Sequence, residues 1–431
     1  MLNVNEMYDQ KLVSPAEAVK VIKSGDLIYT PSEGNEPCIL WEALADRKEE
    51  LENVVVRQFL TRRKHRYVEP SFAPHIFIES LFVTDAIRNL VHDGYASYVP
   101  SNFSDIPRMI RQTNHVDVLM LSATPIDEYG YMCYGLGCDY TLAAIEVAKK
   151  IIVEVNPNMP WTGGYNKIHV SQVDLIVESN AELYELQPPQ VTELDEKIGS
   201  YIVDLIDEGS TLQIGIGGIP AAVCKFLEHK KDLGIHTELI SDYLVGLLES
   251  GAVNGSKKTI HKGKVVCTIV EGTKRFFKYI NNHPSIELLP VDYTNDQHII
   301  AQNRKMVSIN ATIEVDIFGQ CCSESIGTKI WGGSGGQSDF ARGVTKCPDG
   351  KGFIVMKSTA KGGTISKIVP RLTPGAIVTT GMNYVDHVVT EYGVAELRYK
   401  SMRGRALALI NIAHPDFRDE LRFEAKKMNV I

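Results

Sequence analysis

The stretch TLQIGIGGIPAAVCKFLEH, residues 211–229, decides how this chain folds. Its apolar run at residues 211–216 has the length of a buried strand, and the glycines that follow allow a tight turn. Pro220 suits the first turn of a helix over residues 219–229. A strand that turns directly into a helix is the unit from which mainly parallel sheets are built. The stretch therefore predicts an α/β protein.

The same alternation continues on both sides of this stretch. Before it, strands are expected at residues 26–29, 54–59, 116–121, 151–155 and 173–177, and helices at 15–23, 40–47 and 140–150. After it, strands are expected at residues 237–241, 265–270, 376–380 and 387–390, with further β patterns across 285–320. Helices are expected at residues 193–208, 244–250, 276–282, 402–412 and 417–427.

Two prolines mark a boundary between these two sets of elements. Gln187-Pro188-Pro189-Gln190 can continue neither a helix nor a strand. We therefore expect two α/β domains, one at residues 1–190 and one at residues 191–431.

Composition removes several classes of protein. The chain has 431 residues and a formal net charge of -8, which argues against a nucleic-acid partner and against a polybasic membrane surface. Its eight cysteines include no CxxC pair, so we expect reduced thiols packed in cores and a cytoplasmic protein. Residues 1–19 contain no apolar signal-peptide region, and no apolar run is long enough to span a membrane.

Three segments carry residues suited to chemistry. Gly215, Gly217 and Gly218 could let backbone N–H groups approach an anion, although a purely structural turn explains them equally well. Glu238, in GIHTELISD at residues 234–242, could act as a base or nucleophile at a strand end, but such a glutamate is more often a paired structural residue. The glycines of residues 332–336 could present N–H groups to an oxyanion.

Together with other segments, these motifs resemble the acetyl-CoA hydrolase/transferase family. The C-terminal motifs are GIGGIP (215–220), GIHTELISD (234–242), CSESIGTKIWGGSGGQSDFARG (322–343), STAKGGTISKIVP (358–370), VTEYGVAEL (389–397) and ALINIAHPDF (408–417). The N-terminal motifs are GNEPCIL (34–40), VDVLMLSATPIDEYGYMCYGLGCDYT (116–141) and NPNMPWTGGYNKIHVSQVDLIVE (156–178). The resemblance covers the whole chain in order and implies two open α/β domains of CoA-transferase type.

The resemblance also implies a site and a reaction. Glu238 would carry CoA as a glutamyl thioester in a ping-pong exchange between acyl-CoA and a carboxylate, and Gly336 would stabilise the oxyanion. The positions that match family contacts to CoA are Gln213, Ile214, Gly215, Ile216, Gly217, Ile313, Gly336 and Lys361. Glu36-Pro37 and the turn Tyr134–Gly137 would form the acyl pocket, with the site between the two halves.

The implied partners are short-chain acyl-CoA, such as 4-hydroxybutyryl-CoA or butyryl-CoA, and a carboxylate such as acetate. Coenzyme A would be a substrate, with no tightly bound cofactor and no metal, and the protein would be a homodimer. An acyl-CoA hydrolase using the same glutamate and a non-catalytic CoA-binding regulator are the alternatives. The sequence departs from the family pattern at Tyr243, where glycine is usual, and at Tyr134 and Cys138, where small residues are common. We expect these three departures to affect acyl specificity.

Overall fold

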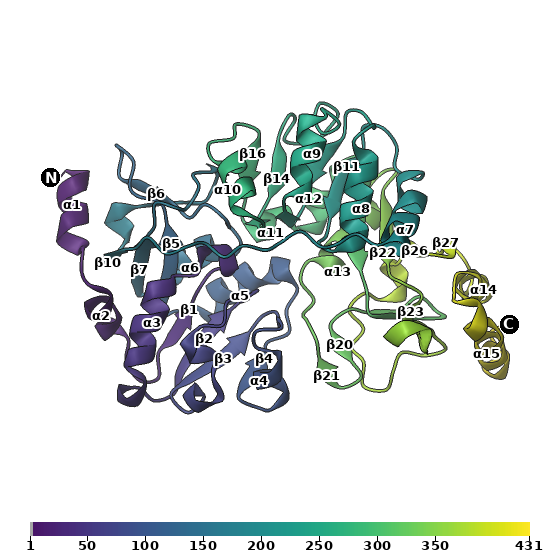
Figure 1. Ribbon diagram of the computed structural model, residues 1–431, viewed down its shortest axis with the longest axis horizontal. Helices are drawn as coiled ribbons and strands as arrows, with labels where there is room; N and C mark the ends of the chain where they lie inside the picture. The colour runs from purple at the N-terminus through teal and green to yellow at the C-terminus, as the bar shows by residue number, and fades with distance from the viewer. Residues whose placement is uncertain (1–2) are drawn as a thin grey trace. The chain divides into compact units, whose positions relative to one another are not determined.

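The structure is a computed structural model that describes residues 3–431. The chain divides into two compact units (Figure 1). Unit 1 comprises Met1–Gln187 and Val266–Thr294, and unit 2 comprises Pro188–Val265 and Asn295–Ile431.

The segment Val266–Thr294 belongs with the N-terminal residues, whereas the boundary expected at residue 190 places it in the C-terminal domain. Backbone hydrogen bonds inside unit 1 explain its position. The N–H of Cys138 donates to the carbonyl of Thr268 at 2.8 Å, and the N–H of Val291 donates to the carbonyl of Asp139 at 3.0 Å. Such pairing between distant segments leaves no local pattern in the sequence.

Unit 1 is built on a seven-stranded sheet with the order β10-β7-β5-β1-β2-β3-β4, in which every neighbouring pair is parallel. In that order the strands are Leu175–Glu178, Lys150–Val155, Val118–Ala123, Leu27–Tyr29, Val54–Gln58, Ile76–Ser80 and Ala96–Tyr98. All six residues of β5 are buried, as expected for a central strand covered on both faces.

Helices and short strands complete unit 1. The helices are α1 (Val4–Lys11), α2 (Pro15–Ala18), α3 (Cys38–Asp46), α4 (Arg88–His92), α5 (Ile106–Thr113), α6 (Thr141–Val147), α10 (Lys274–Ile280) and α11 (Val291–Thr294). The short strands are β6 (Tyr131–Cys133), β8 (Gly163–Gly164), β9 (Lys167–His169), β15 (Ile269–Val270) and β16 (Ile286–Leu288), while β14 (Val265–Cys267) lies at the unit boundary.

Within unit 2 the main strands follow the order β27-β26-β22-β17-β11-β12. In that order they are Gly393–Glu396, His387–Thr390, Lys351–Val355, Met306–Ala311, Thr211–Ile214 and Gly234–His236. Only β27 pairs in the antiparallel sense, so the expected mainly parallel α/β architecture is confirmed. The chain leaves β11 toward β12 on one side and later returns to β17 on the other, which creates a topological switch point beside β11.

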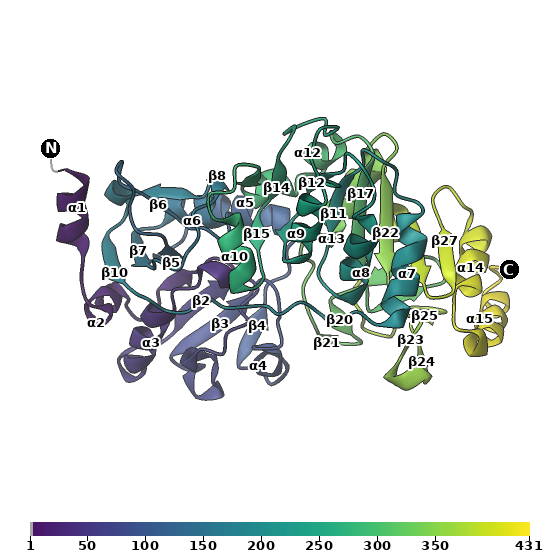
Figure 2. The ribbon, with the colours of Figure 1, turned by 45° about the horizontal axis from the view of Figure 1, so that its top comes forward.

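Helices α7 (Glu193–Val203), α8 (Gly218–Leu227) and α9 (Tyr243–Glu249) pack next to one another in unit 2 (Figure 2). Helix α13 (Gln337–Lys346) packs against β17 and β22. The remaining helices are α12 (Gln297–Ala301), α14 (Met402–Asn411) and α15 (Pro415–Lys427). The remaining strands are β13 (Leu239–Ile240), β18 (Glu314–Asp316), β19 (Cys321–Cys322), β20 (Ser325–Ile326), β21 (Lys329–Ile330), β23 (Thr359–Ala360), β24 (Ile365–Ser366) and β25 (Ile368–Val369).

Two local predictions are wrong. Residues 298–302 were expected to contribute to the β pattern, but they lie in and after α12, which begins because the side chain of Asp296 accepts from the N–H groups of His298 and Ile299. Residues 376–380 were expected to form a strand, but only Thr380 pairs, in a single bridge with Cys321. A short apolar run alone does not distinguish these cases.

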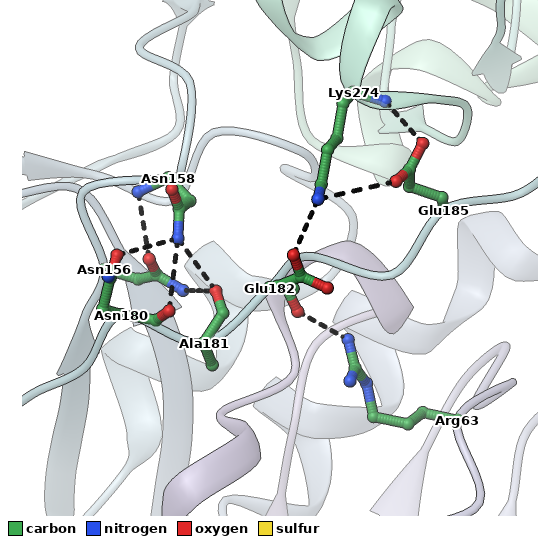
Figure 3. A network of polar contacts seen from close by, with 8 residues as sticks. All are labelled: Arg63, Asn156, Asn158, Asn180, Ala181, Glu182, Glu185 and Lys274. Atoms are coloured by element: carbon green, nitrogen blue, oxygen red, sulfur yellow. Dashed lines mark hydrogen bonds and ion pairs between the residues drawn. The ribbon is translucent and has the colours of Figure 1, made fainter.

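The segment that leaves unit 1 is fixed to that unit by a polar network (Figure 3). The side-chain amides of Asn156 and Asn158 donate to the carbonyl of Ala181 at 2.8 and 3.1 Å. Arg63 donates to the carbonyl of Glu182 at 2.8 Å, and Lys274 forms an ion pair with the Glu182 carboxylate at 2.8 Å. The chain is therefore held in unit 1 up to the region just before Gln187.

No helix in the described part of the chain is long and apolar enough to cross a membrane.

Candidate active site

The predicted CoA and catalytic residues of unit 2 follow the carboxyl ends of neighbouring parallel strands. The turn at residues 215–217 follows β11, Glu238 follows β12, Ile313 follows β17, and Lys361 follows β22. Because the strands are parallel, all four segments start from the same edge of the sheet, beside its switch point. Ligands of open α/β sheets bind at this edge.

The sequence predicted Glu238 within a strand at residues 237–241. In the structure it lies in a break between two strands. Strand β12 ends at His236, and β13 begins at Leu239. The hydroxyl of Thr237 donates to the carbonyl of Leu239 at 3.2 Å and accepts from the N–H of Ile214 at 3.4 Å. The break leaves the Glu238 side chain half-buried, and Thr237 links it to the turn after β11.

Asn295 holds the Glu238 carboxylate. Its side-chain amide donates to Oε2 of Glu238 at 2.7 Å, and Asn295 is only 1% exposed. The described residues offer its other side-chain atom, Oδ1, no hydrogen-bond partner. A buried amide donor orients a carboxylate and can stabilise negative charge as that charge moves during a reaction. Sequence reasoning missed Asn295, which lies 57 residues from Glu238 and belongs to no recognisable motif.

Gly336 is packed directly against this pair. A Cβ atom built on Gly336 would lie 2.0 Å from Oε2 of Glu238 and 2.2 Å from Nδ2 of Asn295. Only glycine leaves room for both groups, and its φ of -97° shows that the requirement is steric rather than conformational. Gly336 is also the N-cap of α13, and within residues 3–431 its N–H has no protein acceptor.

Glu324 anchors the glycine-rich loop that leads to Gly336. The carbonyl of Glu324 accepts from the N–H groups of Trp331 and Gly332 at 2.8 and 3.2 Å. Its carboxylate accepts from the hydroxyl of Ser334 at 3.2 Å, and Glu324 is 3% exposed. The loop is therefore an ordered support for Gly336 and not a flexible linker.

The end of β11 and the turn that follows it contain five of the predicted CoA contacts, Gln213 to Gly217. The buried Gln213 exchanges two side-chain hydrogen bonds with Asn310, at 3.1 and 3.0 Å. Gly217 has a φ of 127°, which a residue with a side chain adopts only with strain, and Ile216 is 38% exposed. Tyr243 contacts this turn, because its hydroxyl donates to the carbonyl of Gly215.

Two further predicted CoA contacts are Ile313 and Lys361, and a second lysine, Lys367, lies beside Ile313. Lys361 is exposed, and Ile313 is fixed by its N–H, which donates to the carbonyl of Cys322 at 2.9 Å. Lys367 donates to the carbonyl of Thr312 at 3.2 Å. Burial lowers the pKa of Lys367 to about 8, while the carboxylate of Glu391 acts in the opposite direction.

The predicted acyl-pocket residues cluster within unit 1. Asn35 donates to the carbonyl of Gly137 at 3.2 Å and accepts from the N–H of Leu136 at 3.2 Å. Next to Asn35, Glu36 is 5% exposed, and its Oε2 lies 3.3 Å from a ring nitrogen of His65. Oε1 of Glu36 has no partner in the described part of the chain. The stretch GNEPCIL and the turn Tyr134–Gly137 are therefore in contact through Asn35.

Tyr134 and Cys138, the two residues of unit 1 that are expected to affect acyl specificity, are both buried. Tyr134 donates its hydroxyl to the carbonyl of Tyr165 at 3.0 Å. Burial raises the pKa of the Cys138 thiol well above its ordinary value. All eight cysteines are free thiols. Among the described residues, no three His, Cys, Asp or Glu side chains gather in a way that could hold a metal ion.

Both halves of the chain match domains of the same protein family. Residues 2–186 match the acetyl-CoA hydrolase/transferase N-terminal domain, and residues 272–425 match the C-terminal domain of that name. The chain is 51% identical to succinyl-CoA:cyclohexane-1-carboxylate CoA transferase of Geobacter metallireducens, over 98% of this chain and 97% of that protein. It is 44% identical to 4-hydroxybutyrate coenzyme A transferase of Clostridium kluyveri, over 98% and 99% of the two chains.

A solved structure shares the fold along the whole chain. The crystal structure of 4-hydroxybutyrate CoA-transferase from Porphyromonas gingivalis superimposes with a TM-score of 0.85 at 38% identity, covering 98% of this chain and 99% of that one. Acetyl-CoA hydrolases are more distant, such as that of Yarrowia lipolytica at 27% identity over 72% of this chain.

Proposed function

Because this chain belongs to the acetyl-CoA hydrolase/transferase family, we propose that it is a CoA-transferase whose covalent carrier is Glu238. The observation that carries the proposal is the contact of Glu238 with Asn295 and Gly336 at the ligand-binding edge of the sheet. The names of the more similar relatives, which are transferases rather than hydrolases, support the same reaction class.

The first half of the reaction transfers CoA to the enzyme. The carboxylate of Glu238 attacks the thioester carbonyl, the C–S bond breaks, and CoA leaves as a thiolate from a mixed acyl-glutamyl anhydride. The thiolate then attacks the glutamyl carbonyl, which forms the Glu238–CoA thioester and releases the acyl group as its carboxylate. The second half runs these steps in reverse with the acceptor carboxylate. No net oxidation occurs, and no proton must be gained or lost overall.

Each attack creates a tetrahedral oxyanion, and two groups next to Glu238 are suited to stabilise it. The free N–H of Gly336 and the amide of Asn295 are both fixed before the substrate arrives, so little reorganisation is needed. One such donor is typically worth about 2.7–4 kcal/mol. Asn295 also keeps Oε1 and Oε2 of Glu238 in a defined orientation, which favours attack by one oxygen.

The substrates follow from the relatives and from the site. We propose a short-chain acyl-CoA, with 4-hydroxybutyryl-CoA or butyryl-CoA as the donor and acetate as an acceptor. Residues 213–217, at the end of β11 and in the turn after it, would contact CoA together with Ile313 and Lys361, because exposed N–H groups and a lysine suit its phosphates. Glu36 and the turn Tyr134–Gly137 would contact the acyl group.

The test is acyl exchange with and without acetate. With butyryl-CoA and acetate, acetyl-CoA should form as fast as butyryl-CoA disappears, and free CoA thiol should not accumulate. Without acetate, no acetyl-CoA should form, and at most one equivalent of butyryl-CoA per site should disappear. Free thiol released at an equal rate in both reactions would refute the transferase and favour the hydrolase.

We also propose that the enzyme is a cytoplasmic homodimer. The free state of all eight cysteines supports a reducing compartment, and the family resemblance suggests the dimer. Light scattering of the purified full chain should give twice the mass of 47.9 kDa, and a single-chain mass would contradict the dimer.

A further inference from the structure

The turn after β11 is held from two directions by groups outside it. The N–H of Gly215 donates to the carbonyl of Ile309, on the neighbouring strand β17, at 3.2 Å. The carbonyl of Gly215 accepts from the hydroxyl of Tyr243, the first residue of α9. Both polar atoms of this glycine are therefore fixed before any ligand binds.

The second of these bonds determines where the next N–H points. The carbonyl of Gly215 and the N–H of Ile216 belong to one planar trans peptide, so they point in opposite directions. Binding of the carbonyl by Tyr243 therefore directs the Ile216 N–H away from Tyr243. Within the described residues, the N–H groups of Ile216, Gly217 and Gly218 have no protein acceptor.

These three consecutive donors lead into the ten-residue helix α8, whose N-cap is Gly217 and whose N-terminus favours negative charge. A flip of the peptide between Gly215 and Ile216 would turn the Ile216 N–H away from the N–H groups of Gly217 and Gly218. Glycine lowers the barrier to such a flip, since Gly215 and Gly217 flank Ile216 on both sides and Gly217 already adopts a φ of 127°. The three N–H groups stay aligned only if the Gly215 carbonyl is held in place, and the hydrogen bond from the Tyr243 hydroxyl holds it.

We propose that Tyr243 is a positioning residue for CoA: its hydroxyl fixes the Gly215–Ile216 peptide so that the Ile216 N–H faces the CoA ligand. This inference rests on the proposed function of the turn as a CoA contact. The Tyr243 hydroxyl acts on CoA affinity through the turn and leaves acceptor binding unchanged.

The test compares Tyr243→Phe with the wild type and with Tyr140→Phe. Tyr140 is a matched control, because its buried hydroxyl also donates to a backbone carbonyl, that of Thr30, but in unit 1. Calorimetry measures the Kd for CoA, steady-state kinetics measures KM for butyryl-CoA and for acetate, and thermal unfolding measures Tm for each protein.

For Tyr243→Phe we expect the Kd for CoA and the KM for butyryl-CoA to rise about two- to tenfold, the effect of losing one neutral hydrogen bond. The KM for acetate should stay at the wild-type value, and Tyr140→Phe should change neither constant. A wild-type Kd in Tyr243→Phe, or an equal rise in both KM values, would overturn the inference.

The outcomes also separate this inference from the proposed function. A wild type that binds CoA but exchanges no acyl group contradicts the transferase, and weaker CoA binding by Tyr243→Phe then still supports the positioning role. A wild type that does not bind CoA overturns both proposals.

Discussion

Replacing Gly336 with alanine tests the contact at the centre of the site. The new Cβ would lie 2.0 Å from Oε2 of Glu238 and 2.2 Å from Nδ2 of Asn295, where ordinary contacts begin at 3.4 Å. The carboxylate and the amide must therefore retreat by more than about 1 Å, and the 2.7 Å hydrogen bond between them breaks or bends. The substitution causes no backbone strain, because a φ of -97° is allowed for alanine.

Two separate estimates, one from the displacement and one from the lost hydrogen bond, give a similar loss of rate for Gly336→Ala. A misplacement of about 1 Å at a reacting group costs roughly 10²-fold in rate. Loss of a hydrogen bond to a charged group costs about 1.5–3 kcal/mol, which corresponds to about 10- to 150-fold. We therefore expect kcat for acyl exchange to fall about 10²-fold in Gly336→Ala. Overpacking should also lower the free energy of unfolding by about 1–3 kcal/mol.

The assay is the initial rate of acetyl-CoA formation at saturating butyryl-CoA and acetate, with Tm measured on the same preparation. Gly381→Ala is the matched control, because its Cβ would meet nothing within 4 Å and its φ is -67°. The control should keep the wild-type rate and Tm. A folded Gly336→Ala enzyme that keeps kcat within about threefold of the wild type would refute the steric reasoning.

Three further predictions concern neighbouring groups. Glu238→Gln should reduce transfer more than about 10³-fold because the amide is a poor nucleophile, while the Kd for CoA stays unchanged in calorimetry; comparable transfer would rule out covalent catalysis by this residue. Asn295→Ala should lower kcat about 10- to 100-fold with little change in the KM for acetate, and an unchanged kcat would remove the amide from the mechanism. Burial lowers the pKa of Lys367 to about 8, so the folded state binds fewer protons than the unfolded state from there up to the ordinary lysine pKa. Relative to Lys367→Met, the wild type should therefore gain up to about 3 kcal/mol of unfolding free energy as the pH rises from about 8 to about 10.5, measured by urea unfolding; a pH-independent difference contradicts this burial effect.

The sequence predicts the elements whose signals are local. The stretch at residues 211–229 folds as a strand, a glycine turn and a helix because its apolar run, glycines and Pro220 all favour that order. The helices near the C-terminus are likewise found close to their expected positions, at Met402–Asn411 and Pro415–Lys427. Long periodic patterns and proline positions are sufficient for these elements.

The sequence does not predict what depends on distant pairing. Asn295 reaches Glu238 only because α11 ends and α12 begins at that point, and Asp296, which caps α12, lies in a region that looked like β structure. Glu238 was expected inside a strand, but the chain breaks there because Thr237 bonds locally and leaves the ladder. Both features arise from tertiary contacts and carry no periodic signal of their own.

Trapping the covalent intermediate tests the central claim most directly. The full chain is incubated with butyryl-CoA in the absence of acceptor, treated with borohydride, digested and examined by peptide mass spectrometry. A thioester at Glu238 is reduced to the alcohol, so the peptide that contains Glu238 should lose the mass difference between a carboxyl group and a primary alcohol, and Glu238→Gln should show no such change. Reduction at another residue would contradict the account, and so would an unmodified Glu238 peptide in a preparation that transfers CoA once acetate is added.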